Sequence, residues 1–131
     1  MTPIYKLLTT ATCLTTLALP ALAGGDAETG RSLYQARCAA CHSMDFNGVG
    51  PAHRGVFARA AAQAKGFAYS DALKASHLVW TEDALDRWLA DPEKVAPGQR
   101  MGINVPDAND RADLIAYLKS ASATKSAART E

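Results

Sequence analysis

Five consecutive residues, Cys38-Ala39-Ala40-Cys41-His42, have a spacing that suits one particular chemistry. Two thiols one helical turn apart can each add to a vinyl group of a haem, which tethers the macrocycle along one edge. The histidine that directly follows the second thiol then lies under the iron, where an imidazole nitrogen can bind it. The pattern predicts one covalently bound haem c, attached through Cys38 and Cys41, with His42 as an axial ligand of the iron.

Two other readings of the cysteine pair are weaker. A Cys-x-x-Cys pair can form a disulfide or a thioredoxin-like redox motif. Such a redox motif accompanies βαβ elements, which are not visible in the sequence, and it would leave His42 without a role. A zinc site would need two further ligands, and no second cysteine pair follows the first.

An iron bound by His42 needs a ligand on its other side. Met44 follows His42 too closely to reach the opposite face, whereas Met101 lies far along the chain in a loop that contains proline and glycine. A methionine opposite a histidine is a known axial arrangement of covalently bound haem. We therefore predict Met101 as the second axial ligand. The alternatives are His53 and His77.

The first 23 residues have the pattern of a secretory signal peptide. Lys6 gives a positive start, residues 7–19 are apolar but broken by threonines, and Ala21-Leu22-Ala23 offers the small residues that a signal peptidase reads. The apolar stretch is too short to span a bilayer as a helix. We expect cleavage after Ala23 and a periplasmic location, with no stable membrane span.

Length and charge limit the kinds of function. The 131 residues favour a single domain. Without Lys6, the chain keeps 13 basic and 13 acidic residues, so its formal net charge is zero. This balance argues against nucleic acid as a partner, because nucleic-acid binding needs clustered positive charge. We expect a monomer.

Three main helices are predicted around the cysteine pair. Asp26 caps the first, which runs to about Ala39. Thr81 caps the second, whose apolar residues recur at helical spacing until Pro92 ends it. The third covers about residues 107–121 and has an apolar stripe.

Long loops and short helices connect these three elements. Ser70 is expected to cap a short helix that ends near Ala75, and residues 58–64 are predicted to form one or two helical turns. The other connections are rich in glycine and proline, and no alternating strand is evident. Residues 122–131 are small and polar, which predicts a flexible tail after a domain of residues 24–121. Loops this long leave too little core unless a large cofactor fills the middle. The sequence thus predicts an all-α fold packed around one haem.

The order of these motifs resembles the class I c-type cytochromes, including the c2-like carriers, over roughly residues 30–119. In that family a glycine and an aromatic residue on the first helix pack against the last helix. Gly30 and Tyr34 match these positions, which implies packing against Leu114 and Tyr117.

The resemblance also implies roles around the haem. The carbonyl of Pro51 is expected to accept the second N–H of His42, and residues 97–101 resemble the loop of the axial methionine. Three residues match the surroundings of the haem propionates: Arg59, Tyr69 and Trp80. Gln99 and Arg100 depart from the usual threonine and lysine, and the lysine ring of the mitochondrial proteins is absent.

The function that the resemblance implies is that of a soluble one-electron carrier rather than an enzyme. Its iron would cycle between Fe(III) and Fe(II), with partners such as a dehydrogenase, a cytochrome bc1-type complex or a terminal oxidase. Two alternatives stay open: a dedicated subunit of a periplasmic dehydrogenase, and a haem enzyme or gas sensor with a labile Met101. No nucleophile–base pair or phosphate-binding loop is visible in the sequence.

Overall fold

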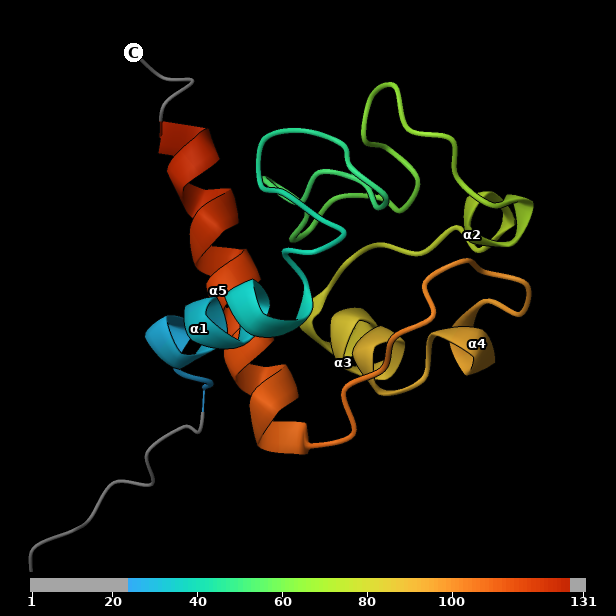
Figure 1. The fold of residues 1–131 in the computed structure, drawn as a ribbon. Helices are drawn as coiled ribbons and strands as arrows, with labels where there is room; N and C mark the ends of the chain where they lie inside the picture. The colour runs from blue at the N-terminus through green and yellow to red at the C-terminus, as the bar shows by residue number, and fades with distance from the viewer. Residues whose placement is uncertain (1–23, 128–131) are drawn as a thin grey trace, which may run out of the picture.

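Two helices from opposite ends of the chain cross each other and frame the fold. The computed structural model describes residues 24–127, and in it helix α1 (Ala27–Arg37) lies across helix α5 (Ala108–Ala127) (Figure 1). The long loop of residues 43–69 and the loop of residues 96–107 lie to one side of this crossing. The prediction of an all-α fold is confirmed, since the described residues contain helices and one isolated β-bridge.

The crossing of α1 and α5 depends on a close approach of their backbones. The Asp26 carboxylate caps α1 by accepting from the Thr29 N–H at 2.6 Å, as predicted. A Cβ on Gly30 would lie 1.9 Å from the carbonyl oxygen of Asp113, so only glycine fits there. Tyr34 then packs on Tyr117, with ring centroids 5.3 Å apart. The implied packing of Gly30 and Tyr34 against the last helix is therefore present.

Helix α3 (Glu82–Ala90) begins at the predicted cap, since the Thr81 hydroxyl accepts from the Ala84 N–H at 3.2 Å. The helix buries Leu85 and Trp88. Pro92 follows the end of α3, as predicted, but it also begins a short helix, α4 (Pro92–Val95), that the sequence does not predict. Asp91 ends α3 and caps α4 by accepting from the Lys94 N–H, and proline suits the first turn of a helix because it needs no N–H there.

The segment before α3 departs from the prediction in one place. Helix α2 (Asp71–Ala75) is capped by Ser70, as expected. The helical turns predicted for residues 58–64 are wrong. Ala58 and Ala62 have φ values of 62° and 59°, and Ala60 forms an antiparallel bridge with Val79. The conformation of this segment thus depends on a partner 19 positions away, which no pattern within residues 58–64 indicates.

The prediction that the last helix ends near Ala121 is also wrong. Helix α5 continues to Ala127, so the first six residues of the predicted tail are helical. Ser122 fixes this extension, because its hydroxyl accepts from the Phe57 N–H at 3.1 Å. The predicted signal peptide at residues 1–23 and the last four residues, 128–131, lie outside the described residues. Among residues 24–127, no helix has the length and apolarity needed to cross a membrane.

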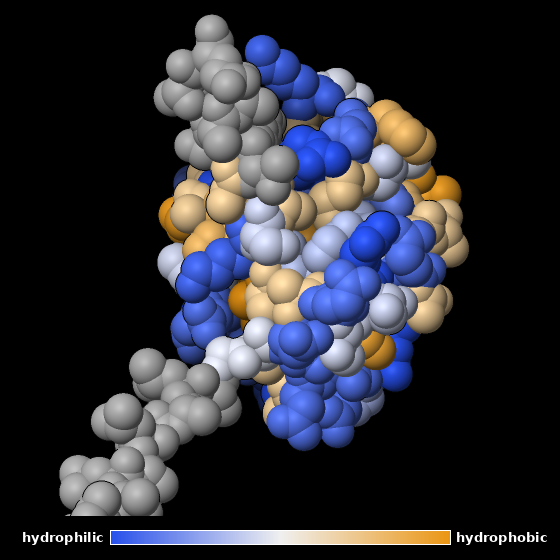
Figure 2. Space-filling view, turned by 90° about the vertical axis from the view of Figure 1, so that its left-hand side faces the viewer, coloured by the Kyte–Doolittle hydropathy of each residue, from blue (hydrophilic) through white to orange (hydrophobic). Residues whose placement is uncertain are grey.

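The buried side chains gather between the crossing and α3. Most come from α1, α3 and α5, and the most deeply buried of them are Leu114 and Val105. Polar residues predominate on the outer face over α1 and α5, with apolar residues scattered between them (Figure 2). The helices therefore turn their apolar faces inward, toward the space described next.

Candidate functional site

A cavity of about 440 Å³ lies in the middle of the fold. Its lining is mostly apolar and comes from α1, α3, α5 and both long loops. All eight residues that the sequence singles out line it: Cys38, Cys41, His42, Pro51, Arg59, Tyr69, Trp80 and Met101. These residues are spread over more than 60 positions of the chain, so their meeting in one cavity is a property of the fold.

The two cysteines and His42 form one turn at the C-terminal end of α1. The His42 N–H donates to the Cys38 carbonyl at 2.9 Å, and the Gly50 N–H donates to the Cys41 carbonyl at 2.8 Å. Burial raises the pKa of the Cys38 thiol to about 11, although Arg37 acts in the opposite direction. A thiol used for disulfide exchange needs a lowered pKa and often sits at a helix N-terminus. The arrangement of this turn disfavours a thioredoxin-like role.

The His42 ring is held at one nitrogen and closely covered. Its Nδ1–H donates to the Pro51 carbonyl at 2.8 Å, which is the bond that the resemblance implies. A Cβ on Gly50 would lie 2.2 Å from Cε1 and within 2.6 Å of both ring nitrogens, so glycine is required beside the ring. Burial lowers the pKa of His42, which keeps the ring neutral with Nε2 as its remaining acceptor.

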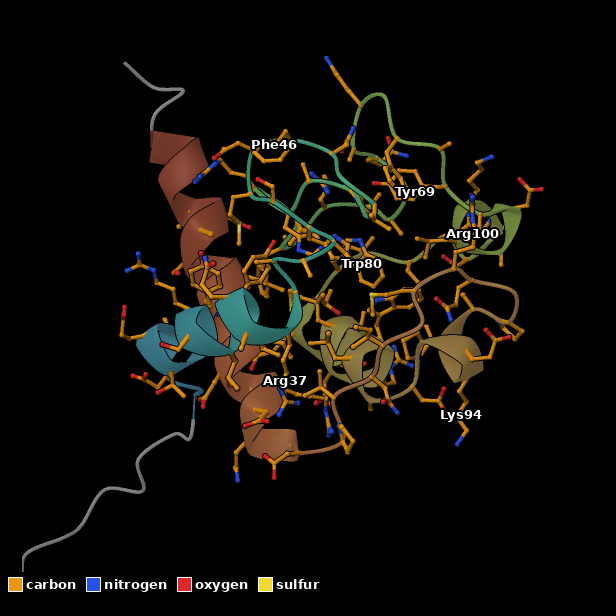
Figure 3. All side chains as sticks on the ribbon, in the orientation of Figure 1. Arg37, Phe46, Tyr69, Trp80, Lys94 and Arg100 are labelled. Atoms are coloured by element: carbon orange, nitrogen blue, oxygen red, sulfur yellow. The ribbon has the colours of Figure 1, made fainter. Side chains whose placement is uncertain are left out.

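Met101 enters the cavity from a loop that is pinned before it. The Glu93 carboxylate accepts from the Gly98 N–H at 2.8 Å and from Gln99 Nε2 at 3.3 Å. The oxygen of the same Gln99 side-chain amide, Oε1, accepts from the Met101 N–H. Arg100 donates to the carbonyl of Ala68 at 2.9 Å. Figure 3 shows Arg100 and Tyr69 on the same side of the molecule, beyond Trp80.

The same loop is also held after Met101. The Val105 N–H donates to the Leu89 carbonyl at 2.7 Å, which joins the loop to the end of α3. Arg111 of α5 donates to the carbonyls of Val105 and Pro106, at 3.0 and 2.7 Å. The methionine side chain is therefore presented by a backbone that is fixed on both sides.

Arg59 and Trp80 are brought together by backbone pairing. The Trp80 N–H donates to the Arg59 carbonyl at 2.9 Å, and the Ala58 N–H donates to the Trp80 carbonyl at 3.0 Å. The Tyr69 hydroxyl accepts from the Ala64 N–H at 3.0 Å. Arg59 Nε is fully buried and finds no acceptor within residues 24–127. A buried donor without a partner is costly, which points to an acceptor supplied by a bound group.

Comparison with known proteins assigns the family. The cytochrome c family profile matches residues 27–122. The chain belongs to the cytochrome c family. It is 40% identical to a cytochrome c of Gibberella zeae over 102 residues, which are 75% of this chain and 96% of the relative. It is 43% identical to a cytochrome c2 of Rhodoblastus acidophilus over 98 residues, covering 72% of this chain and 91% of the relative.

A solved structure agrees. Cytochrome cH from Methylobacterium extorquens superposes with a TM-score of 0.71 at 46% identity, covering 73% of this chain and 99% of that chain. The fold is thus the cytochrome c fold. As a member of the cytochrome c family, the protein is an electron carrier and not an enzyme, and the family implies a covalently bound haem.

The charged side chains that line the cavity are basic. Among the residues that the structure describes, its lining includes three arginines, namely Arg37, Arg59 and Arg100, and no aspartate or glutamate. The apolar walls suit a flat macrocycle, and the arginines suit anionic groups at its rim. The described residues therefore fit a haem with two propionates.

The other candidate ligands are not placed opposite His42 across the cavity. His77 is exposed and does not line the cavity, and Met44 packs against the core. His53 does line the cavity, but its ring stacks on His42 with centroids 4.0 Å apart, on the same side of the cavity. Burial lowers the pKa of His53 to about 3, helped by His42 and Arg59, so the ring is neutral. Sequence reasoning missed this contact, because a lone histidine in a loop carries no periodic signal.

Proposed function

We propose that the chain carries one haem c, bound through thioethers to Cys38 and Cys41, with His42 and Met101 as axial ligands. Each thiol adds across a vinyl double bond and its hydrogen passes to carbon, so attachment needs no oxidant. When bound, the iron supplies a one-electron Fe(III)/Fe(II) couple. One observation carries the proposal: the eight residues chosen from the sequence line a single apolar cavity.

The protein's own residues hold each part of the group. The Pro51 carbonyl fixes the tautomer of His42 and makes Nε2 the ligating nitrogen. The pinned loop holds the Met101 thioether, a soft ligand that favours the reduced iron. Arg59, whose Nε lacks an acceptor within residues 24–127, binds a propionate together with Trp80 and Tyr69.

In this role the protein passes single electrons between larger redox proteins. The proposed partners are a dehydrogenase, a cytochrome bc1-type complex or a terminal oxidase, met through small transient interfaces by a monomer. Val49 and Ile103 both line the cavity and are 80% and 50% exposed, so apolar surface lies at its mouth.

A signal peptide of residues 1–23 sends the chain to the periplasm. The exported protein should begin at Gly24 when its N-terminus is sequenced.

The first test is whether haem stays attached after denaturation. The exported protein, denatured and run on a gel, should keep a haem stain, and the double variant Cys38→Ala/Cys41→Ala should lose it. A wild-type band without haem would refute the proposed function.

The second test concerns the sixth ligand. The oxidised protein should show the weak red-end absorption band of methionine–iron ligation. Met101→Ala should abolish this band, while Met44→Ala, which removes a methionine close to His42 in sequence, should keep it. Persistence of the band in Met101→Ala would mean that another residue binds the iron. Rapid carbon monoxide binding to the reduced wild-type protein would instead support a sensor or enzyme with a labile methionine.

A further inference from the structure

His53 lies against His42 and has no part in the function proposed above. The two imidazole rings stack with centroids 4.0 Å apart and an interplanar angle of 21°. The contact is therefore face to face, and it covers the ring that we assign as an iron ligand. At this separation neither ring can tilt far without colliding with the other.

The His53 ring is itself anchored to the helix crossing. Its Nδ1 shares a hydrogen bond with the hydroxyl of Tyr34 at 3.2 Å, and its backbone N–H donates to the Ser43 carbonyl at 2.9 Å. Tyr34 is 3% exposed and packs on Tyr117 of α5. The α1–α5 crossing is thus connected, through one hydrogen bond, to the ring that covers His42.

The hydrogen bond to Pro51 leaves one freedom of His42 undetermined. It fixes where Nδ1 lies and which tautomer is present, but small combined changes of χ1 and χ2 can still turn the ring about the line through its two nitrogens. Rotation about that line changes the plane of the ring without breaking the bond. The stacked face of His53 opposes this rotation on one side, and the close backbone of Gly50 limits the space around Cε1 and both nitrogens.

We propose that His53 is a positioning residue that fixes the ring plane of His42, with Tyr34 as its anchor. The inference rests on the proposed function, since it concerns the plane of an iron ligand. The plane of an axial imidazole sets how unpaired electron density spreads over a low-spin ferric haem. An apolar residue of similar size would fill the same volume without the hydrogen bond that orients the stacked ring.

The test uses the oxidised holoprotein with haem attached. His53→Leu keeps the bulk and loses the ring, and Tyr34→Phe keeps the ring and loses only the anchoring hydrogen bond. Ile115→Val is the matched control, because Ile115 is 3% exposed in the core and does not line the cavity. The readouts are the positions of the paramagnetically shifted haem methyl resonances and the g-values from electron paramagnetic resonance, with thermal unfolding measured alongside.

We expect His53→Leu to redistribute the methyl resonances and shift the g-values, with Tyr34→Phe producing a smaller change in the same sense. Ile115→Val should lower stability while leaving both spectra close to wild type. Wild-type spectra in both His53→Leu and Tyr34→Phe would overturn the proposal, as would an equal change in Ile115→Val. If His53→Leu does not fold, an unchanged spectrum of Tyr34→Phe overturns it alone. Absence of covalent haem in the wild type would refute the proposed function instead.

Discussion

Arg111 in α5 donates from Nη1 to the carbonyl of Val105 at 3.0 Å and so connects the last helix to the loop that carries Met101. Its Nε donates to Asp86 of α3 at 2.7 Å. The Arg111 side chain is 13% exposed. One guanidinium thus joins two helices and the loop between them.

Replacing Arg111 by methionine should remove all of these bonds and keep much of the packing. Hydrogen bonds to charged groups contribute about 1.5–3 kcal/mol each to stability, so we expect a loss of at least about 2 kcal/mol. The red-end absorption band should also disappear at a lower temperature than in wild type. Urea unfolding and the temperature dependence of the band measure these effects.

Arg87→Met is the control, because Arg87 forms an exposed i,i+4 pair with Asp83. Exposed pairs contribute about 0.5 kcal/mol or less. If Arg111→Met lowers the free energy of unfolding by no more than Arg87→Met does, Arg111 does not hold the loop.

Gly30→Ala should separate α1 from α5. The added Cβ would lie 1.9 Å from the Asp113 carbonyl oxygen and 3.0 Å from Cβ of Tyr117, and backbone atoms cannot yield as a side chain does. Overpacking of this kind costs about 3 kcal/mol or more. Gly24→Ala is the matched control, since nothing lies within 4 Å of its added carbon. Equal thermal unfolding midpoints for the two variants would contradict the crossing as described.

Ala58→Gly should stabilise the protein. Ala58 has a φ of 62°, where a residue with a Cβ is strained by about 1 kcal/mol and glycine is not. The gain is expected to be somewhat below that amount, because glycine also gains entropy in the unfolded chain. Ala60→Gly, in the same loop, exposed and without positive φ, should destabilise instead. Chemical unfolding shows whether each variant is more or less stable than the wild type. A loss of stability in both would argue against strain at Ala58.

Acid should weaken the cap of α1 through Asp26. Its hydrogen bonds to Thr29 lower the pKa below the ordinary 3.8. Because the folded-state pKa is the lower one, the stabilisation is present above pH 3.8 and is lost as the pH falls through the folded-state value. Asp26→Asn keeps an oxygen to cap the helix but cannot titrate. The stability of the wild type should therefore fall more steeply than that of Asp26→Asn below about pH 4, as measured by urea unfolding across pH. If the free energies of unfolding of the two proteins change in parallel with pH, the cap does not depend on the charge of Asp26.

Features encoded over a few residues could be predicted from the sequence. Asp26, Ser70 and Thr81 cap helices where expected, because a cap depends on a side chain and an N–H three residues later. The turn of residues 38–42 is local in the same way. Met101 could be predicted from its loop and its distance from His42 along the chain. Adding the other cavity residues required the family resemblance, since no spacing relates Arg59 to Met101.

Two of the errors arise where distant contacts decide the backbone. Residues 58–64 are rich in alanine and predict helical turns, yet pairing with Val79 imposes a bridge. Ser122 belongs to a polar stretch, but its bond to Phe57 keeps it helical. In both cases the deciding partner is absent from the local pattern. The third is local: Pro92 predicts the end of a helix, but the preceding Asp91 caps a new one.

The α1–α5 crossing also has a consequence for biosynthesis. The Asp26 N–H meets the Asp113 carboxylate 87 positions later, so the first helix cannot pack on α5 until at least that many further residues have been synthesised. Closing so large a loop is entropically unfavourable until the contact forms. Until α5 docks, the turn of residues 38–42 at the end of α1 lies on an open chain, so both of its sulfur atoms are accessible for the haem attachment proposed above.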